Sequence, residues 1–133
     1  MAYSPLGNFL LPQNIADTST KKLTDLGTRV TCKDPVYGVG EFIYLKGVAL
    51  TGVGDAVTFN LDDGTTALLA ANAIGPVAWS MSANVANQYG WYQTYGKAIG
   101  KVATGFVDDA NVYATATGGT VDDAVVAGDR VKN

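Results

Sequence analysis

The sequence predicts an all-β protein: a single compact antiparallel β-barrel or sandwich with an extended N-terminal arm. From Thr28 onward, glycines recur every few residues and short runs of β-branched or aromatic residues lie between them. This spacing is typical of short strands joined by tight turns. The composition, 47% hydrophobic and 16% charged, is too apolar for a disordered chain. A chain of 133 residues suffices for one domain with one core.

Two segments of the expected domain carry the clearest strand signals. In residues 41–46, charged residues bracket an apolar centre, which indicates a central strand that is buried on both faces. Asp63-Gly64 predicts a tight hairpin that pairs its flanking runs antiparallel, because these residues accept positive φ angles. The expected strands are residues 29–33, 40–46, 56–61, 66–70, 77–82, 91–95, 98–102, 111–115 and 120–126.

Residues 1–27 are expected to form the arm, and residues 28–133 the β domain. The first dozen residues contain two prolines and apolar side chains without a helical or alternating period. Such a segment lies on a surface of its own domain, of a neighbouring subunit or of another protein. A short helix is expected over residues 17–26, with Asp17 or Thr18 as N-cap and Gly27 as its stop, although the threonines weaken this prediction.

The sequence lacks the usual equipment of an enzyme. It has no histidine, one glutamate (Glu41) and one cysteine (Cys32), so general acid/base pairs, activated nucleophiles and zinc sites are not expected. A small hydrolase that uses aspartates is therefore a distant alternative. Three aspartate doublets lie in expected turns, where their carboxylates bond local amides; calcium binding is the alternative. The doublets are 62–63, 108–109 and 122–123. We expect no catalytic residue, metal or cofactor.

Charge and hydropathy exclude two classes of partner. The net charge is −3 and the nine basic residues are scattered, apart from Lys21-Lys22, so a nucleic-acid partner is not expected. No run reaches the roughly 18 to 20 apolar residues of a membrane span, and no secretory signal is recognisable. We therefore expect a soluble protein made in a cytoplasm, with Cys32 as a small buried residue without a disulfide partner.

Aromatic residues and glycines are concentrated in residues 89–102. On a strand, Trp91 and Tyr95 share one face and Tyr92 takes the other. These rings, with Tyr89, pack in the core, form a subunit interface, or stack on a ligand such as a sugar. Gly100 is a position where another backbone or an aromatic ring is expected to approach closely.

Four segments of the second half resemble capsid decoration (cement) proteins of tailed bacteriophages. They are Ala73–Ala83 (AIGPVAWSMSA), Gln88–Gln93 (QYGWYQ), Gly96–Val102 (GKAIGKV) and Gly119–Ala124 (GTVDDA). In that family such segments build the strands of a compact β-barrel. The resemblance covers about residues 73–126 and does not extend to the arm or the first strands.

The resemblance implies a structural virion protein on the outer capsid surface, synthesised in the bacterial host cytoplasm. Such proteins bind the phage head, often as homotrimers, and stabilise contacts between major capsid protein subunits. On this reading the apolar arm contacts the capsid or an adjacent copy. The residues expected to do so are Tyr3, Leu6, Phe9, Leu10 and Leu11. The alternative is a carbohydrate- or receptor-binding module of a head fibre or tail, with sugars stacking on Trp79 or Trp91.

Overall fold

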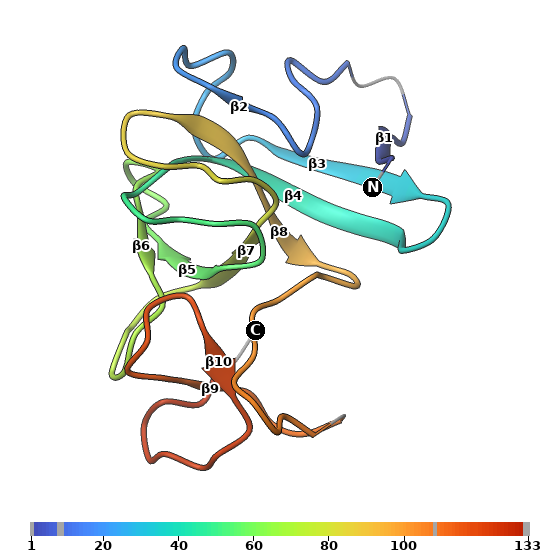
Figure 1. The fold of residues 1–133 in the computed structure, drawn as a ribbon. Helices are drawn as coiled ribbons and strands as arrows, with labels where there is room; N and C mark the ends of the chain where they lie inside the picture. The colour runs from blue at the N-terminus through green and yellow to red at the C-terminus, as the bar shows by residue number, and fades with distance from the viewer. Residues whose placement is uncertain (1, 8–9, 108, 132–133) are drawn as a thin grey trace.

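The structure, a computed structural model, describes residues 2–7, 10–107 and 109–131, and these contain strands and turns but no helix (Figure 1). The predicted all-β class is confirmed. The strands are β1 (Ser4–Pro5), β2 (Thr18–Ser19), β3 (Arg29–Asp34), β4 (Gly38–Lys46), β5 (Ala56–Phe59), β6 (Thr66–Leu68), β7 (Val77–Ser80), β8 (Tyr89–Tyr95), β9 (Tyr113–Ala114) and β10 (Val121–Asp122).

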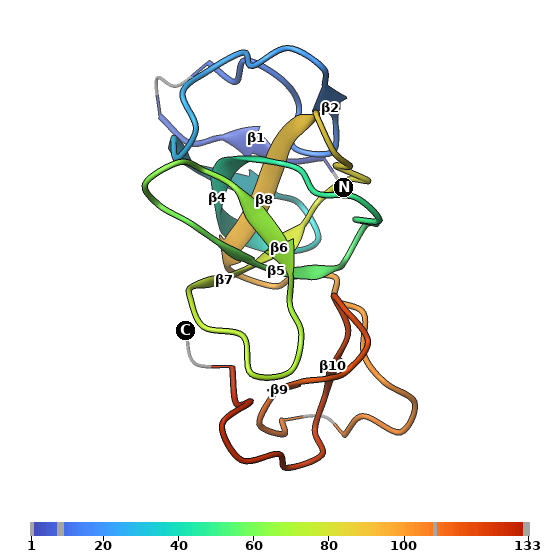
Figure 2. The ribbon, with the colours of Figure 1, turned by 90° about the vertical axis from the view of Figure 1, so that its left-hand side faces the viewer.

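Eight of these strands form one antiparallel sheet in the order β1-β3-β4-β8-β7-β5-β6, with β2 paired to β8. The sheet curls, so that its last strand returns to the end of β4. The Lys46 N–H donates to the Gly64 carbonyl over 2.9 Å, and the Thr66 hydroxyl donates to the Lys46 carbonyl over 2.7 Å. In Figure 2, β5 and β6 lie nearer the viewer and β4 lies behind them.

Strand β4 separates two of the three core clusters. Phe42 and Tyr44 face the first cluster, with Cys32 and Met81. Ile43 and Leu45 face the second, inside the curled sheet. All four β4 side chains are fully buried. Since successive residues of a strand point to opposite faces, both faces of β4 are covered. The prediction that residues 41–46 form a central strand buried on both faces is confirmed.

The aromatic residues of β8 divide between the same two clusters. Trp91 packs edge to face on Tyr44, with ring centroids 5.1 Å apart, whereas Tyr92 lies in the second cluster. Both are fully buried, and Tyr95 is 65% exposed at the end of the strand. Of the alternatives open for these rings, core packing therefore holds for Trp91 and Tyr92.

The hairpin expected at Asp63-Gly64 joins β5 to β6. Val57 pairs with Leu68 and Phe59 with Thr66, and Gly64 adopts a φ of 70°. Asp63 Oδ1 accepts hydrogen bonds from the backbone and the hydroxyl of Thr65. A local signal, aspartate followed by glycine, thus fixes the predicted antiparallel pairing.

The helix predicted over residues 17–26 is wrong. Thr18 and Ser19 pair instead with Gly90 and Tyr89 of β8. Farther along the segment, the amide groups bond Tyr44: the Leu23 N–H donates to its hydroxyl and the Gly27 N–H to its carbonyl. Threonine has low helix propensity, so bonds to the sheet outweigh the weak tendency of this segment to form a helix.

The strand predicted over residues 98–102 is also wrong. Val102 makes only an isolated parallel bridge to Val121, and Lys101 bonds the Gly54 carbonyl in the loop before β5. The bend at Gly96, with a φ of 101°, turns the chain out of the sheet after β8. The expected close approach at Gly100 is confirmed, because a Cβ there would lie 2.7 Å from the Trp79 ring.

The C-terminal segment adds a second, two-stranded sheet of β9 and β10 below the main sheet (Figure 1). The strands predicted over 111–115 and 120–126 are present but reduced to two residues each. Between the two sheets lies the third cluster. Its buried members are Ala56, Leu69, Val77, Ala114 and Val121.

Candidate functional site

The predicted arm lies on the first core cluster. Tyr3 packs edge to face on Phe42, with ring centroids 4.8 Å apart, and Leu11 packs against the same cluster. Strand β1 pairs with the end of β3. Leu6 is about half exposed and Leu10 is almost fully exposed; Phe9 lies outside the described residues. Tyr3 and Leu11 therefore lie on the chain's own domain, which is one of the surfaces considered for the arm.

Gln13 fixes the middle of the arm to the sheet. Its Oε1 accepts a hydrogen bond from the Tyr44 hydroxyl at 2.8 Å, and its backbone carbonyl accepts one from Trp91 Nε1 at 3.2 Å. Its side-chain amide donates to the Tyr89 carbonyl. These bonds satisfy the polar atoms of two buried aromatic residues, as burial requires.

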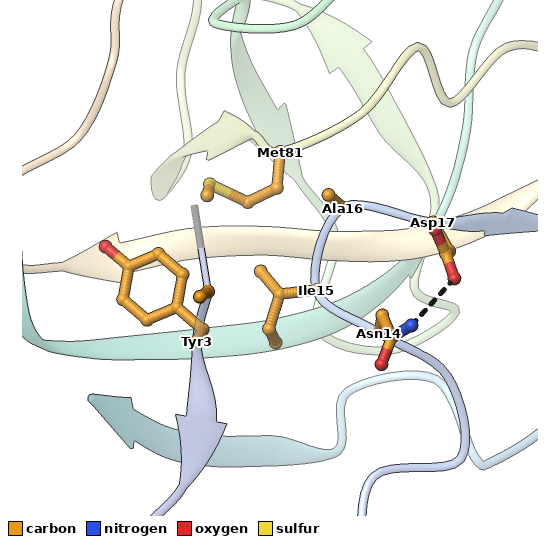
Figure 3. A pocket seen from close by; sticks show the side chains of 7 residues that line it. Tyr3, Asn14, Ile15, Ala16, Asp17 and Met81 are labelled. Atoms are coloured by element: carbon orange, nitrogen blue, oxygen red, sulfur yellow. Dashed lines mark hydrogen bonds between the residues drawn. The ribbon is translucent and has the colours of Figure 1, made fainter. Parts of the chain in front are cut away.

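A cavity of about 320 Å³ opens where the start of the arm meets residues 14–17 (Figure 3). Tyr3, Ile15 and Met81 supply apolar walls, while Asn14 and Asp17 form a polar edge and bond each other at 3.3 Å. Among these lining residues Asp17 is the sole ionisable group apart from the Tyr3 phenol. Burial first, and then the Asp34 carboxylate, raises the pKa of that phenol, so the cavity offers no acid/base pair.

Three buried aspartates hold loops in place. Asp34 accepts backbone hydrogen bonds from Tyr37, Val36 and Ala2, and these bonds, that of Tyr37 first, lower its pKa. Asp55 bonds the Gly52 amide at 2.6 Å and forms an ion pair with Lys101 at 2.7 Å. Asp129 bonds the Asn72 amide. Each carboxylate is occupied by groups of the chain, as the burial of a polar group requires.

The aspartate doublets behave in part as predicted. Asp63 and Asp122 accept bonds from nearby backbone amides, whereas Asp123 accepts one from Val107, sixteen positions away. Asp108 lies outside the described residues. Within residues 2–7, 10–107 and 109–131, no group of three or more histidine, cysteine, aspartate or glutamate residues could hold a metal ion.

Two serine side chains and the cysteine of the sheet region are buried. The Ser80 hydroxyl donates to the Ser82 carbonyl, and both serines are almost fully buried. Cys32 is a free, fully buried cysteine, as predicted, and burial raises the pKa of its thiol. A raised thiol pKa lowers the thiolate fraction and therefore the reactivity.

An open groove of about 620 Å³ lies where the β3–β4 turn meets β7 and the end of β8. It brings together three aromatic side chains that are far apart in sequence. Residues that line it include Tyr37, Val39, Trp79, Gln93, Tyr95 and Lys97. Sequence reasoning singled out Trp79 and Trp91 for ligand stacking; Trp79 lines the groove, whereas Trp91 is fully buried and inaccessible. Tyr37 carried no sequence signal, because only the fold brings its turn beside β8.

Aliphatic side chains project from five separate connections of the fold. Each is at least 80% exposed, although single exposed aliphatic residues are ordinary on protein surfaces. They are Leu10 (91%), Val36 (80%), Leu50 (86%), Ile74 (96%) and Val125 (81%). We call these five residues the loop-tip set. They lie in the β1–β2, β3–β4, β4–β5 and β6–β7 connections and in the segment after β10. The protein thus presents several small apolar contacts at separate places on its surface.

Alkaline titration is expected to destabilise the protein through Tyr92. Burial raises the pKa of this phenol in the folded state, above the value of about 10 for an unfolded chain. The folded state therefore holds the proton more tightly, so this contribution to stability is intact below about pH 10 and is lost as the pH rises through the raised pKa. The urea midpoint of unfolding should fall less steeply with rising pH for Tyr92→Phe than for the parent. Equal slopes would contradict a raised pKa of Tyr92 in the folded state.

Two further findings extend beyond these sites. Among the described residues there is no helix of the length and apolar character that a membrane span requires. Comparison with known proteins gave no match to any family model, curated protein or solved structure.

Proposed function

We propose that this chain is a capsid decoration protein of a tailed bacteriophage. It binds the outer surface of the head, as a homotrimer, and stabilises contacts between major capsid protein subunits. The proposal rests on the sequence resemblance over residues 73–126 and on the loop-tip set, which is the structural observation that carries it.

The loop-tip set suits a protein that touches several neighbours at once. Each aliphatic side chain removes little apolar area from water by itself. When one rigid body presents several of them, the second and later contacts form at a high effective concentration, so weak contacts add up to firm attachment. A decoration protein held between capsid subunits has this requirement.

Stabilisation of a shell needs no reactive group. A protein that binds the assembled lattice but not its dissociated subunits stabilises the lattice by mass action. The carboxylates of Asp34, Asp55 and Asp129 and the hydroxyl of Ser80 are engaged within the fold, in keeping with a role that depends on surface alone.

Undecorated heads of the phage that encodes the chain test the proposal. Purified protein should sediment with these heads up to a saturating ratio, occupy fixed lattice positions in electron micrographs, and raise the temperature at which the heads release DNA. Leu50→Ser combined with Ile74→Ser should weaken sedimentation without changing the urea midpoint, because both side chains are exposed. Heads that bind none of the protein, or virions that lack it, would overturn the proposal.

A further inference from the structure

The groove lies between the β3–β4 turn and the end of β8. No residue of the loop-tip set lines it, although Val36 of that set precedes the lining residue Tyr37. Three aromatic rings from different elements converge on it: Tyr37 from the turn, Trp79 from β7 and Tyr95 from the end of β8. Tyr95 is 65% exposed although it ends a strand of otherwise largely buried residues. Tyr37 and Trp79 are partly buried, and Trp79 also packs against the third core cluster. Aromatic rings that are at least partly exposed on one concave surface are typical of binding sites.

The Trp79 ring is held firmly. Within the sheet Trp79 pairs with Ala56 on one side and Gln93 on the other. Its six-membered ring lies against Gly100, where a Cβ would come within 2.7 Å. A ring already fixed in this way loses little conformational entropy when a ligand stacks on it.

The other two rings are positioned by buried polar side chains. Gln93 Nε2 donates to the carbonyls of Tyr95 (2.9 Å) and Lys97 (3.2 Å), which fixes the bend after β8. On the opposite side, Asp34 Oδ1 accepts the Tyr37 amide at 2.9 Å and so fixes the β3–β4 turn. Both buried groups act on the backbone that carries the aromatic residues.

We propose that this groove binds a neutral carbohydrate, with pyranose rings stacked on Trp79 and Tyr95. The electron-rich face of an aromatic ring attracts the polarised C–H bonds on the face of a sugar. Sugar hydroxyl groups would meet the tyrosine hydroxyls, the Thr94 side chain and the Lys97 ammonium group that also line the groove. Such a mixture of apolar faces and polar edges matches a sugar ring.

Other ligand classes fit this groove less well. A wholly apolar ligand would remain largely in water, since the groove is open and has polar groups along its edge. Nucleic-acid bases could stack on the same rings, but phosphates require cations, and Lys97 is the one charged residue among those that line the groove. A sugar without acidic groups needs no cluster of cations.

A glycan array of neutral and acidic oligosaccharides, probed with the full-length protein, tests the proposal. Neutral hexose oligosaccharides should bind, and titration with a bound one should shift the tryptophan emission. Because Trp91 is fully buried, the shift should come from Trp79 and vanish in Trp79→Phe. Tyr95→Ala should bind the same sugar about tenfold more weakly.

Leu61→Ala serves as the matched control, because Leu61 is 64% exposed and lies outside both the groove and the loop-tip set. It should bind sugar as the parent does, and urea midpoints should confirm that all variants are folded. The proposal would be overturned by an array without bound sugars, by binding confined to acidic glycans, or by binding that folded Tyr95→Ala retains in full. Head binding by the same Tyr95→Ala protein should be unchanged, which separates this proposal from capsid decoration.

Discussion

A Gly47→Ala protein is expected to be recovered largely unfolded. Gly47 follows β4, and its N–H donates to the Gln88 carbonyl at 2.8 Å. A Cβ at this position would lie 2.0 Å from the Asn84 carbonyl oxygen and 2.4 Å from that of Val85. Because these are backbone atoms, no side-chain rotation relieves the overlap. We expect a loss of more than about 4 kcal/mol in the free energy of unfolding, measured by urea denaturation and circular dichroism.

Gly38→Ala is the matched control for this substitution. Gly38 has a φ of 76°, but nothing lies within 4 Å of the position of a Cβ. Its replacement should therefore cost only the backbone strain of a left-handed alanine, about 1 kcal/mol. If Gly47→Ala were as stable as Gly38→Ala, the close approach of the 84–85 backbone to β4 would be contradicted.

The parts of the fold that the sequence predicted correctly depend on local signals. Asp63-Gly64 specifies its hairpin because the requirement for positive φ lies within the turn itself. The run from Glu41 to Lys46 specifies a central strand because hydrophobic residues fill both faces of the pleat. Gly100 was predicted as a site of close approach because it interrupts a run of strand-forming residues. The Trp79 ring that lies against it explains why no side chain fits there.

The parts that the sequence did not predict depend on distant partners. Residues 17–26 have weak helix propensity, and their preference for the sheet is set by Tyr44 and by strand β8, about seventy positions away. The Gln13 contacts with Tyr44 and Trp91 likewise join positions 31 and 78 residues apart. The groove exists because β4 pairs with β8 and thereby brings Tyr37 toward Tyr95. No local pattern contains these pairings.

The apolar arm shows the same division between local pattern and long-range packing. Its composition indicated that its side chains would be covered, but not by what. The structure covers Tyr3 and Leu11 with the chain's own first cluster and leaves Leu10 exposed. The described apolar residues of the arm are therefore of two kinds, and among them only the exposed kind is available to a capsid or to an adjacent copy.

Deletion of residues 2–12 is expected to destabilise the β domain as well as to abolish head binding. The truncation removes β1, the Tyr3 ring on Phe42 and the packing of Leu11, and it takes away the Ala2 amide bonded to Asp34. Loss of two partly buried apolar side chains should cost about 3 to 6 kcal/mol, a large part of the stability of a small domain. Urea denaturation of the truncated protein measures this loss.

A double variant, Leu6→Ser with Leu10→Ser, separates head binding from stability. Leu10 projects into solvent and Leu6 is about half exposed, so the free energy of unfolding from urea denaturation should change by no more than about 1 kcal/mol. If the arm contacts the capsid, sedimentation with undecorated heads should weaken about tenfold. Leu61→Ser, an exposed leucine in the β5–β6 turn, is the control for lost surface hydrophobicity. Full head binding by the double variant would contradict the capsid contact proposed for Leu6 and Leu10. Among the described residues of the arm that were predicted to make this contact, Tyr3 and Leu11 would then remain, and these serve the fold.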